Sequence, residues 1–202
     1  MTRGTWLAVW AAVATAGCLS EPAPLPPIAP PPLAPEAVAV AVIQEADVDG
    51  DGVIEKNEFD RMPALAEAIQ DFDQDRDGGV SAAELQRWLE DVKASGLAQR
   101  AVEGKVLQRN KPMANVTVKF VPEPCMGGRI KAAEAVTDEG GYFSATIPGA
   151  KYRGVHCGFY RIELTGTTPD GQPLPAHYNT QTTLGVAIGT QNPKGDLTLT
   201  LE

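Results

Sequence analysis

Apolar residues recur along the chain with two different spacings, and the spacing changes near residue 100. Between residues 37 and 98 they lie three or four positions apart, which places them on one face of a helix. The groups at this helical spacing are Ala39, Val42, Ile43 and Ala46; Leu65, Ala68, Ile69 and Phe72; and Leu85, Trp88, Leu89 and Val92. From Ala101 onward several short runs have an apolar residue at every second position, as in strands with one buried face. The pattern predicts a multidomain α + β protein, in which a helical region precedes a β-sheet region.

Two twelve-residue loops separate the helical groups, and their acidic side chains follow the same order. Residues 47–58 read DVDGDGVIEKNE, and residues 73–84 read DQDRDGGVSAAE. Positions 1, 3 and 5 of each loop are Asp, position 6 is Gly and position 12 is Glu. Calcium takes six to eight oxygen ligands, so short carboxylates on alternate residues and one longer, bidentate Glu suit it. The predicted ligands are Asp47, Asp49, Asp51, Val53, Glu55 and Glu58 in the first loop, and Asp73, Asp75, Asp77, Gly79, Ser81 and Glu84 in the second, with Val53 and Gly79 acting through their carbonyl groups.

Loops of this kind between two helices resemble EF-hands, and residues 37–98 resemble the compact EF-hand pairs of secreted bacterial proteins. The resemblance implies two bound Ca²⁺ ions. Because Pro63 cannot continue a helix comfortably, we expect a short helix after the first loop and a new helix at residues 64–72 before the second. Ile54 and Val80 share position 8 of their loops and are predicted to pair as a short antiparallel bridge.

The two acidic loops have two other interpretations. Acidic turns without a metal would explain the charge, but not the repeated order of ligands or the helical flanks. A dockerin with a cohesin-type partner would also carry paired calcium loops. Dockerins usually close each loop with Asp, whereas Glu58 and Glu84 close both loops here, so the sequence favours the EF-hand pair.

The start of the chain differs from both regions. Residues 1–17 have a basic residue followed by an apolar stretch, which predicts a signal peptide that is too short to span a bilayer as a helix. The Thr-Ala-Gly before Cys18 resembles a bacterial lipobox, which implies that Cys18 is acylated; ordinary cleavage after Ala16 is the alternative. Residues 18–36 are rich in proline and predict an extended tether. We therefore expect an exported lipoprotein, anchored to the membrane by its N-terminal lipid, at the outer membrane or the periplasmic face of a bacterial cell envelope.

The alternating pattern in residues 101–202 predicts a seven-stranded antiparallel β-sandwich. Turn sequences such as Asn-Lys-Pro and Asp-Glu-Gly-Gly separate the apolar runs. Short strands at this density are typical of sandwich folds. The predicted strands are residues 102–106, 116–120, 132–137, 142–147, 159–164, 183–188 and 197–201.

Three runs in this region resemble a known family of β-sheet domains. They read EGKVLQRNKPMANVTVKFVPE, AVTDEGGYFSATI and LPAHYNTQTTLGVAI. The sequence is similar here to the carboxypeptidase regulatory-like (transthyretin-like) domains of bacterial envelope lipoproteins. The shared features are markers of fold, with no catalytic residue among them, so the resemblance implies a structural or interaction module.

Two cysteines remain if Cys18 carries a lipid. Cys125 and Cys157 predict a disulfide bridge, since disulfides persist in exported proteins. In the chain-entropy description such a bridge stabilises by roughly 3 to 4 kcal/mol. The alternatives are two buried free thiols, or a Cys/His metal cluster that includes His156 but lacks a fourth ligand.

Charge and composition narrow the expected functions. The net charge is −9, and 16 of the 26 acidic residues lie in residues 36–98, which argues against a nucleic-acid partner. Neither histidine of the chain lies in a recognisable nucleophile motif, so we expect no enzymatic activity. The leading expectation is a calcium-binding exported lipoprotein whose sandwich is a structural or interaction module, with a protein or a carbohydrate left open as its partner.

Two further functions were considered for the β-sandwich. One is a calcium-stabilised module that binds carbohydrate or peptide, which an exposed aromatic patch at Tyr152, Phe159 or Tyr178 would support. The other is an accessory subunit of an envelope enzyme, which polar side chains converging in a deep pocket would support.

Overall fold

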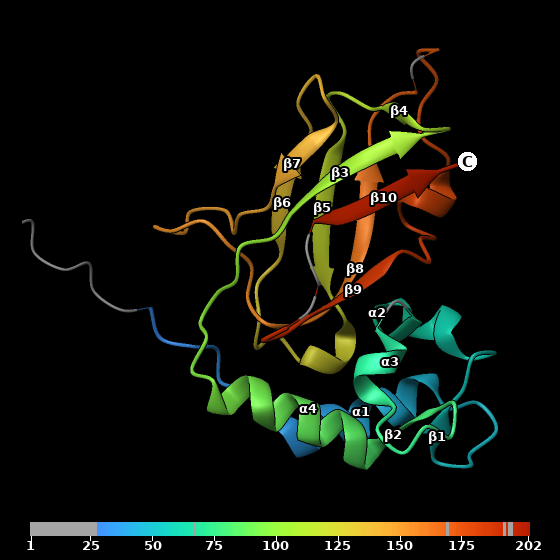
Figure 1. Ribbon diagram of the computed structural model, residues 1–202, viewed down its shortest axis with the longest axis vertical. Helices are drawn as coiled ribbons and strands as arrows, with labels where there is room; N and C mark the ends of the chain where they lie inside the picture. Colours follow the sequence, from blue (N-terminus) through green and yellow to red (C-terminus); the bar gives the residue numbers. More distant parts are fainter. Residues whose placement is uncertain (1–27, 67, 169, 192, 194–195) are drawn as a thin grey trace, which may run out of the picture.

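The computed structural model describes residues 28–66, 68–168, 170–191, 193 and 196–202 (Figure 1). A helical part lies below a β-sheet part in this view, in the order predicted from the hydrophobic spacing. The predicted signal peptide, Cys18 and the predicted tether as far as residue 27 lie outside the described residues. None of the described helices is long and apolar enough to cross a membrane.

The helical part is built on two long helices with short elements between them. The long helices α1 and α4 pack against each other and flank the two acidic loops. Pro35 starts α1, where its fixed φ suits a first helical turn, so the helix begins two residues before the predicted start of the EF-hand pair at residue 37. The elements are α1 (Pro35–Ala46), β1 (Val53–Ile54), η1 (Phe59–Arg61), α2 (Pro63–Ala66), α3 (Ile69–Phe72), β2 (Val80–Ser81) and α4 (Ala82–Ala94).

Three local predictions can be compared with these elements. The pairing of Ile54 with Val80 is confirmed, in an antiparallel bridge between β1 and β2. The short exit from the first loop is also confirmed, as the single 3-10 turn η1. The single helix predicted at residues 64–72 is instead the two short helices α2 and α3, with Pro63 opening the first.

The β-sheet part has two sheets of four strands. One sheet has the order β6-β5-β8-β9; in the other, β3 lies between β10 on one side and β4 and β7 on the other. The sheets pack face to face, since the rings of Phe120 on β5 and Phe143 on β7 have centroids 6.2 Å apart. The strands are β3 (Glu103–Gln108), β4 (Lys111–Pro112), β5 (Thr117–Pro122), β6 (Ala133–Val136), β7 (Tyr142–Ser144), β8 (Gly158–Thr165), β9 (Gly185–Ile188) and β10 (Leu197–Leu201).

The sandwich differs from the predicted one in strand number and in one strand direction. Each of the seven predicted segments overlaps a strand, but the short β4 is an addition. The last strand, β10, runs parallel to β3, with Leu199 opposite Val106. The prediction of a wholly antiparallel sandwich is therefore wrong. The chain leaves β9 in one sheet and enters the other sheet beside β3, so hairpin geometry does not set its direction.

The predicted disulfide is not formed. Cys125, in the 3-10 helix η2 (Pro124–Met126), and Cys157, just before β8, are both buried free thiols. Burial raises the pKa of Cys125 to about 12, so its reactive thiolate form is disfavoured at neutral pH. The alternative of two buried thiols is the one observed, and both side chains contribute to the apolar core.

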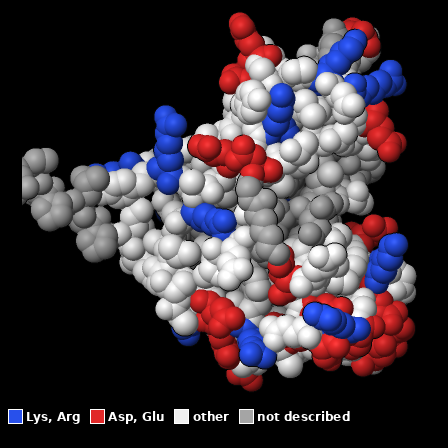
Figure 2. Space-filling model, in the orientation of Figure 1, with Lys and Arg blue, Asp and Glu red and all other residues white. Residues whose placement is uncertain are grey.

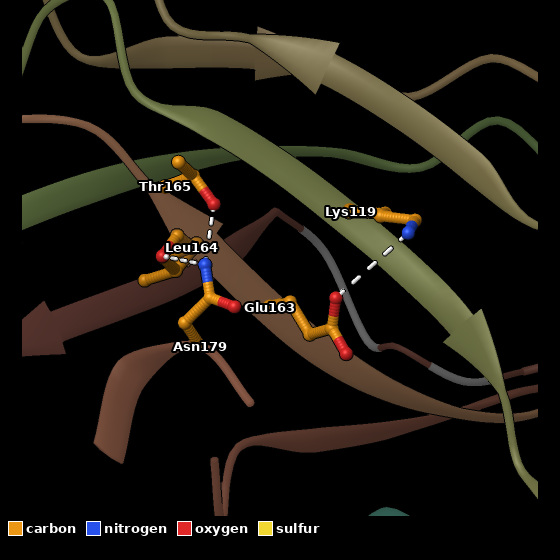
Figure 3. Close-up of polar contacts among 5 residues, drawn as sticks. All are labelled: Lys119, Glu163, Leu164, Thr165 and Asn179. Atoms are coloured by element: carbon orange, nitrogen blue, oxygen red, sulfur yellow. Dashed lines mark hydrogen bonds and ion pairs between the residues drawn. The ribbon is translucent and has the colours of Figure 1, made fainter. Parts of the chain in front are cut away.

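Side-chain contacts on β8 fix the neighbouring segments (Figure 3). Lys119 of β5 and Glu163 of β8 form an ion pair at 3.9 Å across the sheet. Asn179 follows the 3-10 helix η3 (Ala176–Tyr178), and its amide donates to the Leu164 carbonyl at 3.2 Å and to the Thr165 hydroxyl. The sequence between β8 and β9 is thereby held against the end of β8.

The helical and β-sheet parts share one continuous apolar core. Phe72 and Trp88 of the helical part contact Phe159 of β8; the Trp88 and Phe159 rings are stacked with centroids 5.2 Å apart. Gly185 at the start of β9 lies so close to Pro63 that an added Cβ would be 2.4 Å from the Pro63 carbonyl carbon. The sequence predicted two separate modules, whereas the structure packs them together.

Candidate metal centre

The first acidic loop places three predicted ligands together. Carboxylate oxygens of Asp47, Asp49 and Glu58 all lie within 4.8 Å of one another. Backbone N–H groups hold these carboxylates: Glu58 accepts from Val48 at 2.6 Å and from Glu55 at 3.0 Å. Asp47 accepts from the backbone of Gly50 and Gly52, at positions 4 and 6 of the loop, at 2.7 and 2.9 Å. Positions 1, 3 and 12 therefore converge, and backbone N–H groups of the loop hold both carboxylate oxygens of Asp47 and of Glu58.

The second loop repeats this arrangement at Asp73, Asp75 and Glu84, whose carboxylate oxygens also lie within 4.8 Å of one another. Glu84 accepts from the backbone of Gln74 at 2.8 Å and of Ser81 at 2.9 Å. Ser81 and Glu84 also form the capping box that starts α4, in which the Ser81 hydroxyl lies 3.4 Å from the Glu84 backbone nitrogen. The loop and the exit helix are thus fixed by one set of hydrogen bonds.

Left-handed backbone allows both loops to turn sharply. Gly52 and Gly78 at position 6 have φ of +90° and +94°, which a residue with a Cβ adopts only at a cost. At position 4 the first loop has Gly50, but the second has Arg76 at φ +64°. The sequence places Gly at position 6 of both loops, but it does not indicate the left-handed conformation of Arg76.

The remaining predicted carboxylate ligands, Asp51, Asp77 and Glu55, do not belong to the two clusters of three. Asp51 and Asp77 at position 5 accept hydrogen bonds from the backbone of Val53 and Gly79, both at 2.9 Å. These bonds hold position 7, whose carbonyl groups are the predicted ligands there. At position 9, Glu55 is exposed, and Ser81 donates its hydroxyl proton to Glu84 at 2.8 Å. Their assignment as ligands stays a prediction.

Hydrogen bonds set the protonation of the two closing glutamates. The backbone N–H groups of Val48 and Glu55 lower the pKa of Glu58. Burial raises the pKa of Glu84, but the hydrogen bonds from Ser81 and Gln74 outweigh it, so the net shift is downward. Both carboxylates are therefore ionised at neutral pH, as a calcium ligand must be.

A known protein family matches both acidic loops and the helices beside them. Residues 39–63 and 65–89 each match the family model described as EF hand. The two segments form an EF-hand pair. The matches end at residue 89, so they cover the helical part and not the β-sheet part. A search of the curated proteins and one of the solved structures gave no match.

The EF-hand matches, the two carboxylate clusters and the preformed hydrogen bonds support calcium binding at two sites. Figure 2 shows the acidic side chains gathered at the end of the molecule that carries β1 and β2. Clustered carboxylates repel one another, and a divalent cation bound among them removes that repulsion. The residues present therefore fit Ca²⁺.

A buried carboxylate that was not predicted lies where the β-sheet part meets α1. Glu123 is 2 % exposed, and Arg161 Nε lies 3.5 Å from Glu123 Oε2. Burial raises the pKa of Glu123 to about 7; Arg161 opposes the rise and Glu45 of α1 adds to it. No charge pattern distinguishes Glu123 in the sequence, because its burial depends on the contact between the two parts.

Proposed function

We propose that this protein is an exported, lipid-anchored calcium protein in which two bound Ca²⁺ ions brace the β-sheet part. The EF-hand pair holds the ions. Its helices pack against β8 and β9 in the shared core, so metal binding that orders the helices also stabilises these strands. The β-sheet part acts as a structural or interaction module of the carboxypeptidase regulatory-like type.

The observation that carries the proposal is the packing of Trp88 on Phe159. Trp88 lies on α4, the helix that leaves the second metal loop, and Phe159 is a fully buried residue of β8. Gly189, directly after β9, also lies against Trp88, since an added Cβ there would be 2.5 Å from the indole ring. A metal that orders the second loop and α4 therefore also stabilises the surface on which β8 and β9 pack.

The expected stabilisation follows from the affinity of comparable sites. Extracellular EF-hand modules bind Ca²⁺ with a Kd of about 0.1 to 1 mM. At about 5 mM free Ca²⁺ each site then adds roughly 1 to 2 kcal/mol to the free energy of unfolding. The metal is accordingly proposed as a standing structural ligand, because calcium outside the cytosol is not rapidly controlled.

Calorimetry on the full chain tests the metal sites. We expect two binding events, one lost in Asp47→Ala and the other in Asp73→Ala. Lys105→Gln on β3, distant in the fold from both loops, is the matched control and should bind two ions. If the full chain takes up no Ca²⁺ at about 5 mM, roughly five times the weakest expected Kd, the proposal fails.

The proposed cellular setting has a separate test. The N-terminal sequence supports cleavage before Cys18 and acylation of its thiol. Mass spectrometry of the mature protein, isolated from membranes, should find an acylated Cys18 as the first residue. An unmodified N-terminus after Ala16 would leave the calcium sites intact and overturn the lipid anchor.

The three aromatic residues Tyr152, Phe159 and Tyr178 give little support to a carbohydrate- or peptide-binding role for the β-sheet part. Phe159 is fully buried and Tyr178 is 9 % exposed, so neither supplies a surface platform. Tyr152 alone is half-buried. The absence of enzymatic activity stays a prediction, to be tested with the purified protein.

A further inference from the structure

A pocket of about 230 Å³ lies where the described chain begins, on the side of the molecule away from the metal loops. Its lining joins Ile28 to the loop between β7 and β8, and no carboxylate belongs to it among the described residues. Lys131, Lys151 and His156 contribute the polar groups, together with Gln99 and Tyr152. We call this lining the cationic pocket.

Hydrogen bonds hold the backbone at two of the basic residues of the cationic pocket, Lys131 and His156. The Tyr160 hydroxyl, fully buried, lies 3.1 Å from the His156 carbonyl oxygen and 3.4 Å from that of Lys131. The Lys131 backbone N–H donates to His156 Nδ1 at 3.2 Å, so a neutral His156 ring carries its proton on Nε2 as a further donor. Gln99 also lines the pocket, but its buried Oε1 only accepts hydrogen bonds, so it is not one of the anion-binding groups.

These groups match a compact anion. Two ammonium groups and an imidazole N–H can bind phosphate oxygens with charge-assisted hydrogen bonds. The volume is below the roughly 300 to 1,000 Å³ of pockets for drug-sized ligands, and suits a phosphate-sized group. Burial and the nearby Lys131 lower the pKa of His156, so the ring is free to gain a proton when an anion neutralises the site.

The position of the pocket favours a phosphate that belongs to a membrane. In Figure 1 the start of the described chain and the loop between β7 and β8 lie on the left, while β1 and β2 lie at the lower right; Figure 2 shows Lys and Arg side chains projecting on that left side. Ile28 lies ten positions after Cys18, a length of chain that reaches at most roughly 35 Å. Tyr152 at the rim is a residue type enriched at bilayer interfaces.

We propose that the cationic pocket binds the phosphate of anionic phospholipids and holds the β-sheet part against the membrane surface, with the metal loops turned away from it. The closeness of the membrane rests on the proposed lipid at Cys18. The binding itself does not, and it is also independent of calcium.

Vesicle binding tests the proposal with the full chain carrying Cys18→Ser, in chelator, so that neither lipidation nor calcium bridging contributes. Binding to phosphatidylcholine vesicles gives the background from the apolar N-terminal segment, and phosphatidylglycerol is then added to the vesicles. Each basic residue near an anionic surface strengthens binding by roughly fivefold, so Lys131→Gln with Lys151→Gln should weaken the phosphatidylglycerol-dependent binding by roughly 20- to 30-fold. Lys105→Gln with Lys111→Gln removes equal charge from β3 and β4 and should change it little.

Nuclear magnetic resonance locates the bound group. The chain has two histidines, and His177 is exposed on η3, outside the pocket. A short-chain phosphatidylglycerol should raise the pKa of His156 and shift its ring resonances, while the ring resonances of His177 stay in place. Inorganic phosphate at the same concentration should act more weakly. Equal vesicle binding by both double variants, or no dependence on phosphatidylglycerol, would overturn the proposal. A His156 response to inorganic phosphate without vesicle binding would replace it with a site for the free anion.

Discussion

The contact between Trp88 and Phe159 joins the EF-hand pair to the β-sheet part, so removing these rings one at a time and together tests how the two parts are coupled. The rings are stacked with an interplanar angle of 19°. Phe72 contacts both, at centroid distances of 5.1 and 5.9 Å. The perturbation is the cycle of Trp88→Ala, Phe159→Ala and the double variant.

The sizes of the effects follow from burial and ring geometry. Phe159 is fully buried, and truncating such a ring costs about 3 to 5 kcal/mol of unfolding free energy. Trp88 is half-buried, so we expect a smaller loss, about 2 to 3 kcal/mol. Because a stacked aromatic pair contributes about 0.5 to 1.5 kcal/mol beyond its buried area, the double variant should lose that much less than the sum of the single losses.

Urea unfolding in saturating Ca²⁺, followed by circular dichroism, provides the assay. The control cycle pairs Trp88→Ala with Phe143→Ala, whose ring contacts Phe120 inside the sandwich; those losses should add within about 0.5 kcal/mol. Leu replaces Ala at Phe159 if the Ala variant does not fold. Additive losses at Trp88 and Phe159 would refute the reasoning, since rings that do not meet in solution cannot couple.

Three further predictions concern the metal loops, the buried carboxylate and the closest backbone contact. Asp47→Ala and Asp73→Ala should each lower the melting temperature in Ca²⁺ but not in chelator, as scanning calorimetry will show; equal losses in both conditions would contradict a metal role. The pKa of Glu123 is raised from 4.5 to about 7 in the folded protein. The stability that its protonated form contributes is therefore fully present below pH 4.5 and is lost as pH rises through about 7. Glu123→Gln should therefore raise the unfolding free energy above neutral pH by roughly 1 to 3 kcal/mol and flatten its pH dependence between these values, and a loss of stability there would show that the pairing with Arg161 outweighs burial. Gly185→Ala should cost about 1 to 3 kcal/mol in urea unfolding, because its Cβ would displace Pro63; an unchanged midpoint would mean that the helical part does not rest on β9.

Local features of the fold were predictable because short sequence spacings determine them. The positions of Asp and Gly in the loops predicted the carboxylate clusters at Asp47 and Asp73, since a turn of fixed length brings positions 1, 3 and 12 together. The alternation of apolar residues predicted the strand segments in the same way. Both signals act over a few residues, and the surrounding fold does not change them.

Features that depend on distant contacts were not predictable. The direction of β10 depends on which sheet it joins, and the alternating sequence of Leu197–Leu201 suits either direction. The pairing of Cys125 with Cys157 was inferred from the number of cysteines and from the expected export of the protein. Neither says how far apart the two side chains lie. Trp88 was correctly placed on the apolar face of its helix, but nothing in the sequence indicated that Phe159 would cover it.

Amide hydrogen exchange on β8 and β9 tests the central claim most directly, because these strands contain no metal ligand yet pack on the EF-hand pair. Two sites that each add roughly 1 to 2 kcal/mol at about 5 mM Ca²⁺ should slow the most protected amides of both strands by roughly 30- to 1,000-fold relative to chelator. The Asp47→Ala, Asp73→Ala double variant should lose this protection. Exchange in β8 and β9 that stays the same while the metal loops become protected would show that calcium binds without bracing the β-sheet part.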